Sequence, residues 1–182
     1  MTTRPRRHDP ERRDRIIEAA LDVIAAHGVA GTTHRRVAER ADVPLGSMTY
    51  HFAGLEDLLH TAFTRLAESM SRQFAGRLGA ARTTEEAEEA VVDIILGEPG
   101  SNERTLLLSY ELYAFAARHP PLRSVMRDWM ERSQAALRQH FEPGTARALD
   151  ALIEGLMIHR SVDPAPLGAA GIRAIVRKLA RP

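Results

Sequence analysis

Apolar residues recur every three or four positions along the chain, and this spacing predicts helices throughout. No segment has the sustained alternation and β-branched enrichment of a strand. Clusters of Gly and Pro separate the apolar stretches and mark the turns. We therefore expect an all-α fold of about nine helices. Their expected ranges are about 9–28, 34–41, 45–52, 55–78, 84–97, 102–118, 121–140, 145–161 and 166–180.

The first three helices have the arrangement of a helix-turn-helix. Asp9-Pro10 supplies a cap and a first-turn proline for the first helix, and Thr33 can cap the second. The break at Asp42-Val43-Pro44 leaves room for a third helix of only about two turns. Two short helices braced by longer ones are typical of a unit whose second short helix enters the major groove of DNA.

The third predicted helix carries residues suited to that contact. Gly46 would let the backbone come close to DNA, and four neighbours offer hydroxyl or imidazole groups: Ser47, Thr49, Tyr50 and His51. Phe52 is better interpreted as the anchor of the helix end in the core. A purely structural three-helix cluster is the alternative. A metal site at His34 and His51 is not favoured, because neither has a second ligand at suitable spacing.

Charge is distributed unevenly in a nearly neutral chain. The 182 residues are 44% hydrophobic and 27% charged, as in ordinary globular proteins, with a net charge of +1. Binding to an acidic polymer therefore depends on local charge. Residues 1–15 hold six Arg against three acidic residues, and Arg35 and Arg36 lie at the start of the second helix. We expect residues 1–8 to form a flexible basic arm, which either contacts DNA or only aids solubility.

Several function classes lack their sequence signals. The absence of cysteine excludes thiol catalysis, cysteine-bound metals and disulfides. Neither a leader pattern nor an apolar run of the roughly 18 to 20 residues of a spanning helix is present, so we expect a cytoplasmic protein without membrane contact. Phosphate-binding loops and common hydrolase motifs are also missing, so we expect no enzyme, cofactor or metal.

One segment resembles the DNA-binding signature of the TetR family of bacterial transcriptional regulators. The resemblance covers about residues 10–60 and lies in Gly31-Thr32-Thr33, Val37-Ala38, the run ADVPLGSMTYHF over 41–52, and Leu55-Glu56-Asp57-Leu58-Leu59. It implies that the helix start at Thr33, His34 and Arg35 touches phosphate. It also implies that the face from Leu45 through Gly46 and Ser47 to Thr49 meets bases and backbone, and that Tyr50 and His51 contact phosphate.

The chain departs from this signature at three positions. Asp42 stands where glycine is commonest, which suggests a left-handed or bridging conformation that Asp tolerates better than most residues. Pro44 replaces the usual Ser or Thr cap, so that cap hydrogen bond is missing. Leu55 replaces a frequent Lys, which removes one candidate phosphate contact.

The resemblance further implies a ligand cavity among the middle helices. Most aromatic residues of the chain gather there, and such a cluster describes either a small-molecule site or simply a core. Glu111 is a carboxylate in an apolar helix; facing inward it would favour a cationic or hydrogen-bonding ligand, facing outward it would pair with solvent or Arg118. The candidate ligand residues are Phe63, Met70, Phe74, Tyr110, Glu111, Tyr113, Phe115 and Trp129.

The last two predicted helices carry apolar stripes. These resemble the four-helix interface through which TetR-like proteins form twofold dimers. The candidate interface residues are Leu149, Leu152, Ile153, Leu156, Met157, Ile172, Ile175 and Leu179.

We therefore expect a DNA-binding domain over 1–54 and a ligand-binding and dimerisation domain over 55–182. The expected function is that of a homodimeric regulator that binds a palindromic operator in double-stranded DNA and, as a repressor, releases it on binding an unidentified small molecule. The alternative is a helical ligand-binding or protein-interaction module whose reading head no longer binds DNA.

Overall fold

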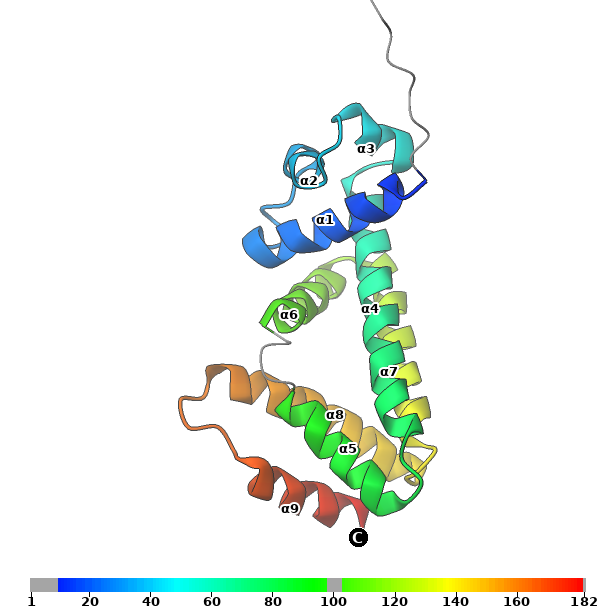
Figure 1. The fold of residues 1–182 in the computed structure, drawn as a ribbon, viewed down its shortest axis with the longest axis vertical. Coiled ribbons are helices and arrows are strands. Elements are labelled where there is room, and N and C mark those ends of the chain that lie inside the picture. Colours follow the sequence, from blue (N-terminus) through cyan, green and yellow to red (C-terminus); the bar gives the residue numbers. More distant parts are fainter. Residues whose placement is uncertain (1–9, 98–102, 182) are drawn as a thin grey trace, which may run out of the picture. The chain divides into compact units, whose positions relative to one another are not determined.

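The computed structural model describes residues 10–97 and 103–181, and every regular element within these ranges is a helix (Figure 1). The predicted all-α class is thereby confirmed, while the basic arm expected at 1–8 lies outside the described residues. None of the described helices is long and apolar enough to cross a membrane. The elements are α1 Arg12–His27, α2 His34–Arg40, α3 Gly46–His51, α4 Leu55–Gly79, α5 Thr84–Leu96, α6 Glu103–Arg118, the 3-10 turn η1 Pro120–Leu122, α7 Arg123–Leu137, α8 Pro143–Val162 and α9 Ala169–Ala180.

The chain divides into two compact units, residues 1–65 and 66–182. Helix α4 runs without a break across the boundary. Its first turns belong to the same unit as α1, α2 and α3. The first unit therefore extends beyond residue 54, where we expected the domain boundary.

Local signals explain how the helices of the first unit begin and end. Gly28, with φ 68°, ends α1, and the Thr33 hydroxyl caps α2 by accepting from the Arg36 N–H at 3.3 Å. Asp42 has φ 51°, which is the left-handed one of the two conformations expected for it, and turns the chain towards α3. Helix α1 starts at Arg12, later than expected, because Pro10 and Glu11 form a turn ahead of it.

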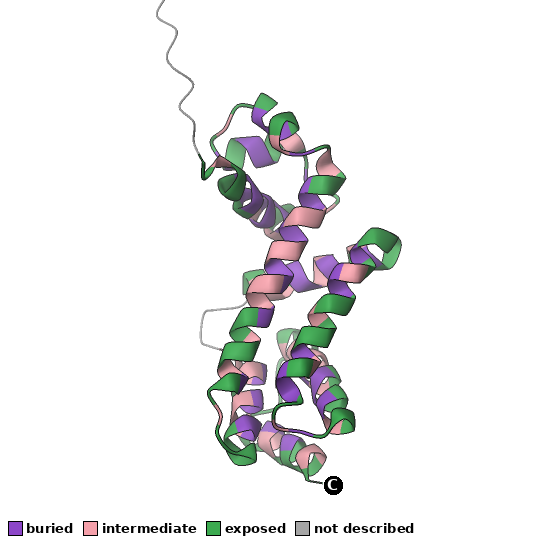
Figure 2. Cartoon of the chain, turned by 90° about the vertical axis from the view of Figure 1, so that its right-hand side faces the viewer, coloured by how far each residue is buried: buried purple, intermediate pink, exposed green. Residues whose placement is uncertain are grey.

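The core of the first unit gathers one side of each of its helices, and Figure 2 shows this buried stripe along the ribbon. Ile16, Val37, Met48 and Phe63 are completely buried. Phe63 was expected in the ligand cavity, and this prediction is wrong. Its ring packs in the core of the first unit, because a small domain needs its few large apolar side chains to form a core.

In the second unit α5 packs against α8 and α9, and α7 packs against α8. Their shared core includes Leu78, Val91 and Leu137. Helix α7 is shorter than the expected 121–140, because Pro120 and Pro121 cannot donate backbone hydrogen bonds and form the 3-10 turn instead.

The acidic run on α5, which comprises Glu85, Glu86, Glu88 and Glu89, is only partly exposed to solvent. Glu88 is 1% exposed, and its carboxylate binds Arg181 Nε at 2.8 Å and Arg177 Nε at 3.6 Å. Beside it, Glu89 accepts from Arg173 Nε at 2.7 Å, and this hydrogen bond holds the pKa of the Glu89 carboxyl below its ordinary value. The run therefore joins α5 to α9.

Candidate nucleic-acid interface and internal cavity

Helix α3 has one face in the core and one face in solvent. Met48 and Phe52 point inward, with exposed fractions of 0% and 3%, whereas Tyr50 is 83% exposed and Leu45 51%. Thr49 is exposed as well. The helix thus presents a hydroxyl, a phenol and an apolar side chain on an outer face, and this chemistry suits contact with base edges and phosphates.

Two residues at the start of α3 differ in how accessible they are to DNA. Ser47 is 9% exposed, so its side chain faces the core, and the prediction that it contacts DNA is not supported. A six-residue helix can expose few positions, and position 47 falls on the inner side with Met48. Gly46 is exposed, and a Cβ placed on it would meet no atom of the chain within 4 Å. Its backbone is therefore open to a close approach from outside.

Three contacts hold α3 and its end in place. The Arg13 guanidinium lies 5.3 Å from the centre of the Phe52 ring, a distance typical of a cation–π interaction. The Tyr50 and His51 rings meet edge to face at 4.9 Å. After the helix, the Asp57 carboxylate accepts from the Ala53 N–H at 2.9 Å.

At the start of α2, the three expected phosphate contacts are not equivalent. Arg35 and Thr33 are exposed, but His34 is half-buried. The Nε2 atom of His34 is buried and has no hydrogen-bond partner within the described residues. Further along α2, Arg40 pairs with Asp22 at 2.7 Å and stays within the unit. Arg35 is therefore an exposed cation of this helix that a phosphate can reach.

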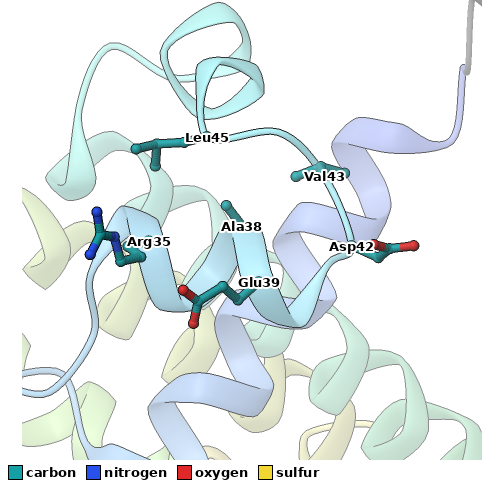
Figure 3. Close-up of a pocket in the computed structure, with 6 residues that line it drawn as sticks. All are labelled: Arg35, Ala38, Glu39, Asp42, Val43 and Leu45. Atoms are coloured by element: carbon teal, nitrogen blue, oxygen red, sulfur yellow. The ribbon is translucent and has the colours of Figure 1, made fainter.

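A hollow of about 290 Å³ lies between α2 and the segment that leads to α3. Figure 3 shows Arg35, Ala38 and Glu39 on the α2 side and Leu45 on the other. Sequence reasoning missed Glu39, whose carboxylate can accept from an amino group on a base edge. No group of three metal-ligating side chains is present in the described ranges.

The second unit contains a cavity of about 120 Å³. Three of the candidate ligand residues line it: Met70, Phe74 and Trp129. Sequence reasoning missed its other walls, which are Gln73, Arg77, Ile94, Gly97, Thr105, Ser133, Asp150, Ile153, Glu154 and Met157.

Four further candidate ligand residues do not line this cavity. Tyr110 shares a hydrogen bond of 2.9 Å with Ser161, and the Phe115 ring lies 3.9 Å from that of His119. Tyr113 reaches the cavity indirectly, because its hydroxyl donates to the Glu154 carboxylate. Glu111 is half-buried. These side chains make contacts of their own, which helical spacing does not show.

The acidic groups of the cavity come from α8. Asp150 is 8% exposed and accepts from the Gln134 side chain at 3.1 Å. Burial raises the pKa of both the Asp150 and the Glu154 carboxyl above their ordinary values, and the hydrogen bonds from Gln134 and Tyr113 only oppose it. Two acids four residues apart in an apolar helix are a sequence signal that could have found them.

The apolar residues of α8 and α9 lie mostly inside the single chain. Leu149, Ile153 and Ile172 are at most 4% exposed, so their assignment to a dimer interface is wrong. Four more expected interface residues are partly buried and pack against the same core: Leu152, Leu156, Met157 and Leu179. Ile175, at 36%, is exposed. The stripe that the sequence shows is needed for the core of the bundle.

Two family models match the chain. One is described as bacterial regulatory proteins of the tetR family and covers residues 16–62. The other is described as a tetracyclin repressor-like C-terminal domain and covers residues 82–182. The matches fall on the helix-turn-helix and on the bundle that holds the cavity.

Known proteins support the same assignment. The solved structure of SCO7518 from Streptomyces coelicolor A3(2), described as a transcriptional regulator, is 47% identical with a TM-score of 0.89, over 95% of this chain and 100% of that one. The multidrug binding protein EbrR in complex with ethidium is 36% identical with a TM-score of 0.78, over 94% of this chain and 100% of that one. The transcriptional regulator SrpR of Pseudomonas putida is 32% identical over 101 residues, which are 56% of this chain and 47% of SrpR. The chain therefore belongs to the TetR family of bacterial helix-turn-helix transcriptional regulators.

Proposed function

We propose that this regulator is a homodimeric repressor that binds a palindromic operator and releases it when a small molecule occupies the cavity of the second unit. The outer face of α3, with Thr49 and Tyr50 exposed beside a buried Met48 and Phe52, is the observation that carries the proposal. One such short helix reads only a few base pairs. A twofold dimer doubles the contact and matches a palindrome.

DNA binding is tested with the intact protein and the DNA upstream of its own gene. We expect a gel shift at low salt on a fragment that contains a palindrome. Changing Tyr50→Phe together with His51→Ala should weaken binding to every sequence, whereas Thr49→Val should alter the preference among sequences by about 1–3 kcal/mol at one position. Equal effects of the two changes on every fragment would contradict this division of roles.

Exposed apolar side chains near the C-terminus support the dimer. Ile158 is 42% exposed, Val162 78%, Leu167 40% and Ile175 36%. They come from α8, α9 and the segment between them. Large apolar side chains gathered in neighbouring elements favour cover by a partner, and a second copy of the same surface satisfies this requirement by symmetry.

The change Val162→Glu is expected to convert the dimer into monomers. A carboxylate in an apolar twofold interface would meet its own copy, and both would lose water. Sedimentation velocity should then show the monomer. Operator affinity should fall by about 100-fold, because the DNA-binding units of the two copies no longer bind together. Met130→Glu is the matched control, since Met130 is 41% exposed on α7. A Val162→Glu variant that stays dimeric would exclude this surface.

The ligand response depends on α4. Met70, Gln73 and Phe74 line the cavity, and the first turns of the same helix belong to the DNA-reading unit. A ligand that prefers one position of the second half of α4 therefore shifts the populations of both units. EbrR is a multidrug binding protein whose structure is solved with ethidium, proflavin and malachite green, and the likeness to EbrR supports a response to a small molecule in this chain. Measuring operator affinity with and without a saturating compound shows whether the ligand weakens or strengthens DNA binding. We expect weaker binding to the operator, and tighter binding would contradict release.

A further inference from the structure

The cavity has two acidic side chains whose hydrogen-bond donors are neutral groups. Asp150 and Glu154 bring two carboxyl groups to it from successive turns of α8. The hydrogen bonds that they accept come from neutral groups, the Gln134 amide and the Tyr113 hydroxyl. The pKa of the Tyr113 hydroxyl is raised by burial and by Glu154, so this phenol remains a donor rather than a second anion.

The cavity also contains one arginine, Arg77 of α4. A guanidinium in contact with a carboxyl group would lower its pKa, yet the pKa values of Asp150 and Glu154 are both raised, chiefly by burial, and the charge of Asp150 raises the pKa of Glu154 further. A positive charge that enters the cavity would remove this cost of ionisation.

A second polar group points to the same conclusion. Ser133 on α7 is 5% exposed and lines the cavity. Its hydroxyl can accept a hydrogen bond from an N–H group of a ligand. The acids and this hydroxyl are thus independent acceptors on two facing helices.

The apolar walls set the shape of the occupant. Trp129 lines the cavity and lies 6.1 Å from the Tyr113 ring, and Met70, Phe74 and Met157 complete the wall. An indole ring attracts a cation over its face. At about 120 Å³ the space is smaller than the roughly 300–1,000 Å³ of a drug-sized site. A larger occupant requires the methionines to move, which their flexible side chains permit.

We propose that this cavity binds a small flat organic cation with N–H donors, which stacks on Trp129 and has the carboxylates of Asp150 and Glu154 as its counter-charges. The inference rests on the proposed ligand response and names the chemical class of the effector. It assigns to each acid a role that core packing does not require.

Three quinolines that differ only in the group at position 4 test this class by titration calorimetry on the intact protein without DNA. 4-Aminoquinoline is a cation near neutral pH and carries N–H donors, 4-methylquinoline is its neutral isostere, and quinoline-4-carboxylate is the anion. We expect 4-aminoquinoline to bind at least about tenfold more tightly than 4-methylquinoline. In the double variant Asp150→Asn, Glu154→Gln, the ratio of the affinities for 4-aminoquinoline and 4-methylquinoline should fall close to one. The control Asp128→Asn, which removes an exposed charge of α7, should leave this ratio unchanged.

The stability of the variant separates a ligand-binding role from a structural one. In the folded protein the pKa of the Asp150 carboxyl lies above its ordinary value of 3.8. The favourable contribution of this group to folding stability is therefore present below pH 3.8 and is lost as the pH rises through the folded pKa. Asn cannot ionise, so Asp150→Asn should melt higher than the natural protein at neutral pH, and the difference should shrink towards pH 4. A structural role requires the opposite, a lower melting temperature.

The possible outcomes are distinct. Tighter binding of the neutral or anionic probe, or no binding of any of the three, would overturn the proposed class. If the double variant kept the affinity ratio of the natural protein, the proposed roles of the two acids would be overturned. Failure of the proposed function would instead appear as a missing gel shift in the absence of any probe, and calorimetry would not detect it.

Discussion

Replacing Phe52 by alanine is expected to abolish operator binding by the intact protein at room temperature. The ring is 3% exposed at the end of α3 and lies under the Arg13 guanidinium. Removing a buried phenylalanine costs about 3–5 kcal/mol, and losing the cation–π contact adds about 0.5–1 kcal/mol. A unit of this size has a total stability of the same order. The helix that reads DNA would then lose its fixed position.

Hydrogen exchange on the full chain, together with gel shifts, measures this effect. The amides of α2 and α3 should exchange faster in Phe52→Ala, while those of α8 keep their protection. Tyr50→Ala is the matched control, because an 83% exposed side chain contributes little to stability. It should weaken DNA binding with unchanged exchange. Full operator affinity in Phe52→Ala would show that the anchor does not position α3.

Replacing Glu88 by glutamine is expected to lower the free energy of unfolding of the second unit by about 2 kcal/mol. The Glu88 side chain is 1% exposed between α5 and α9, where it binds both Arg177 and Arg181. Glutamine keeps the volume but not the charge. The two guanidiniums are about half exposed, at 53% and 52%, so water replaces part of the lost attraction. The cost is therefore smaller than for a fully buried pair.

Denaturant titration of the intact protein measures this loss, and Glu85→Gln provides the comparison. Glu85 also pairs with Arg181, at 2.9 Å, but its side chain is 66% exposed. An exposed pair contributes about 0–1 kcal/mol, and salt screens it. Equal costs for the two variants would mean that burial of Glu88 does not determine the strength of the α5–α9 contact.

Local sequence signals predicted much of the reading head. The Thr33 cap, the turn at Asp42 and the buried Phe52 each follow from residue type and immediate neighbours, and the structure confirms them. The inward position of Ser47 was missed, because in a helix of six residues a single position decides between core and solvent.

The second unit was less predictable, because its side chains find partners far along the chain. Ile153 on an apolar stripe suits a dimer interface as well as a core, and only packing against α5, α7 and α9 assigned it to the core. Glu88 belongs to a run that usually faces water, and its partners lie on α9. The cavity acids on α8 depend likewise on where α6 and α7 pass.

The sequence by itself determined the helical class, the helix-turn-helix and the family, because periodicity, caps and turns are local properties of the chain. Only the tertiary structure decided which apolar stripes are core, which carboxylates are buried and which walls surround the cavity. The reason is physical: burial and pKa depend on the neighbours that a side chain meets in space, and a linear pattern does not contain them.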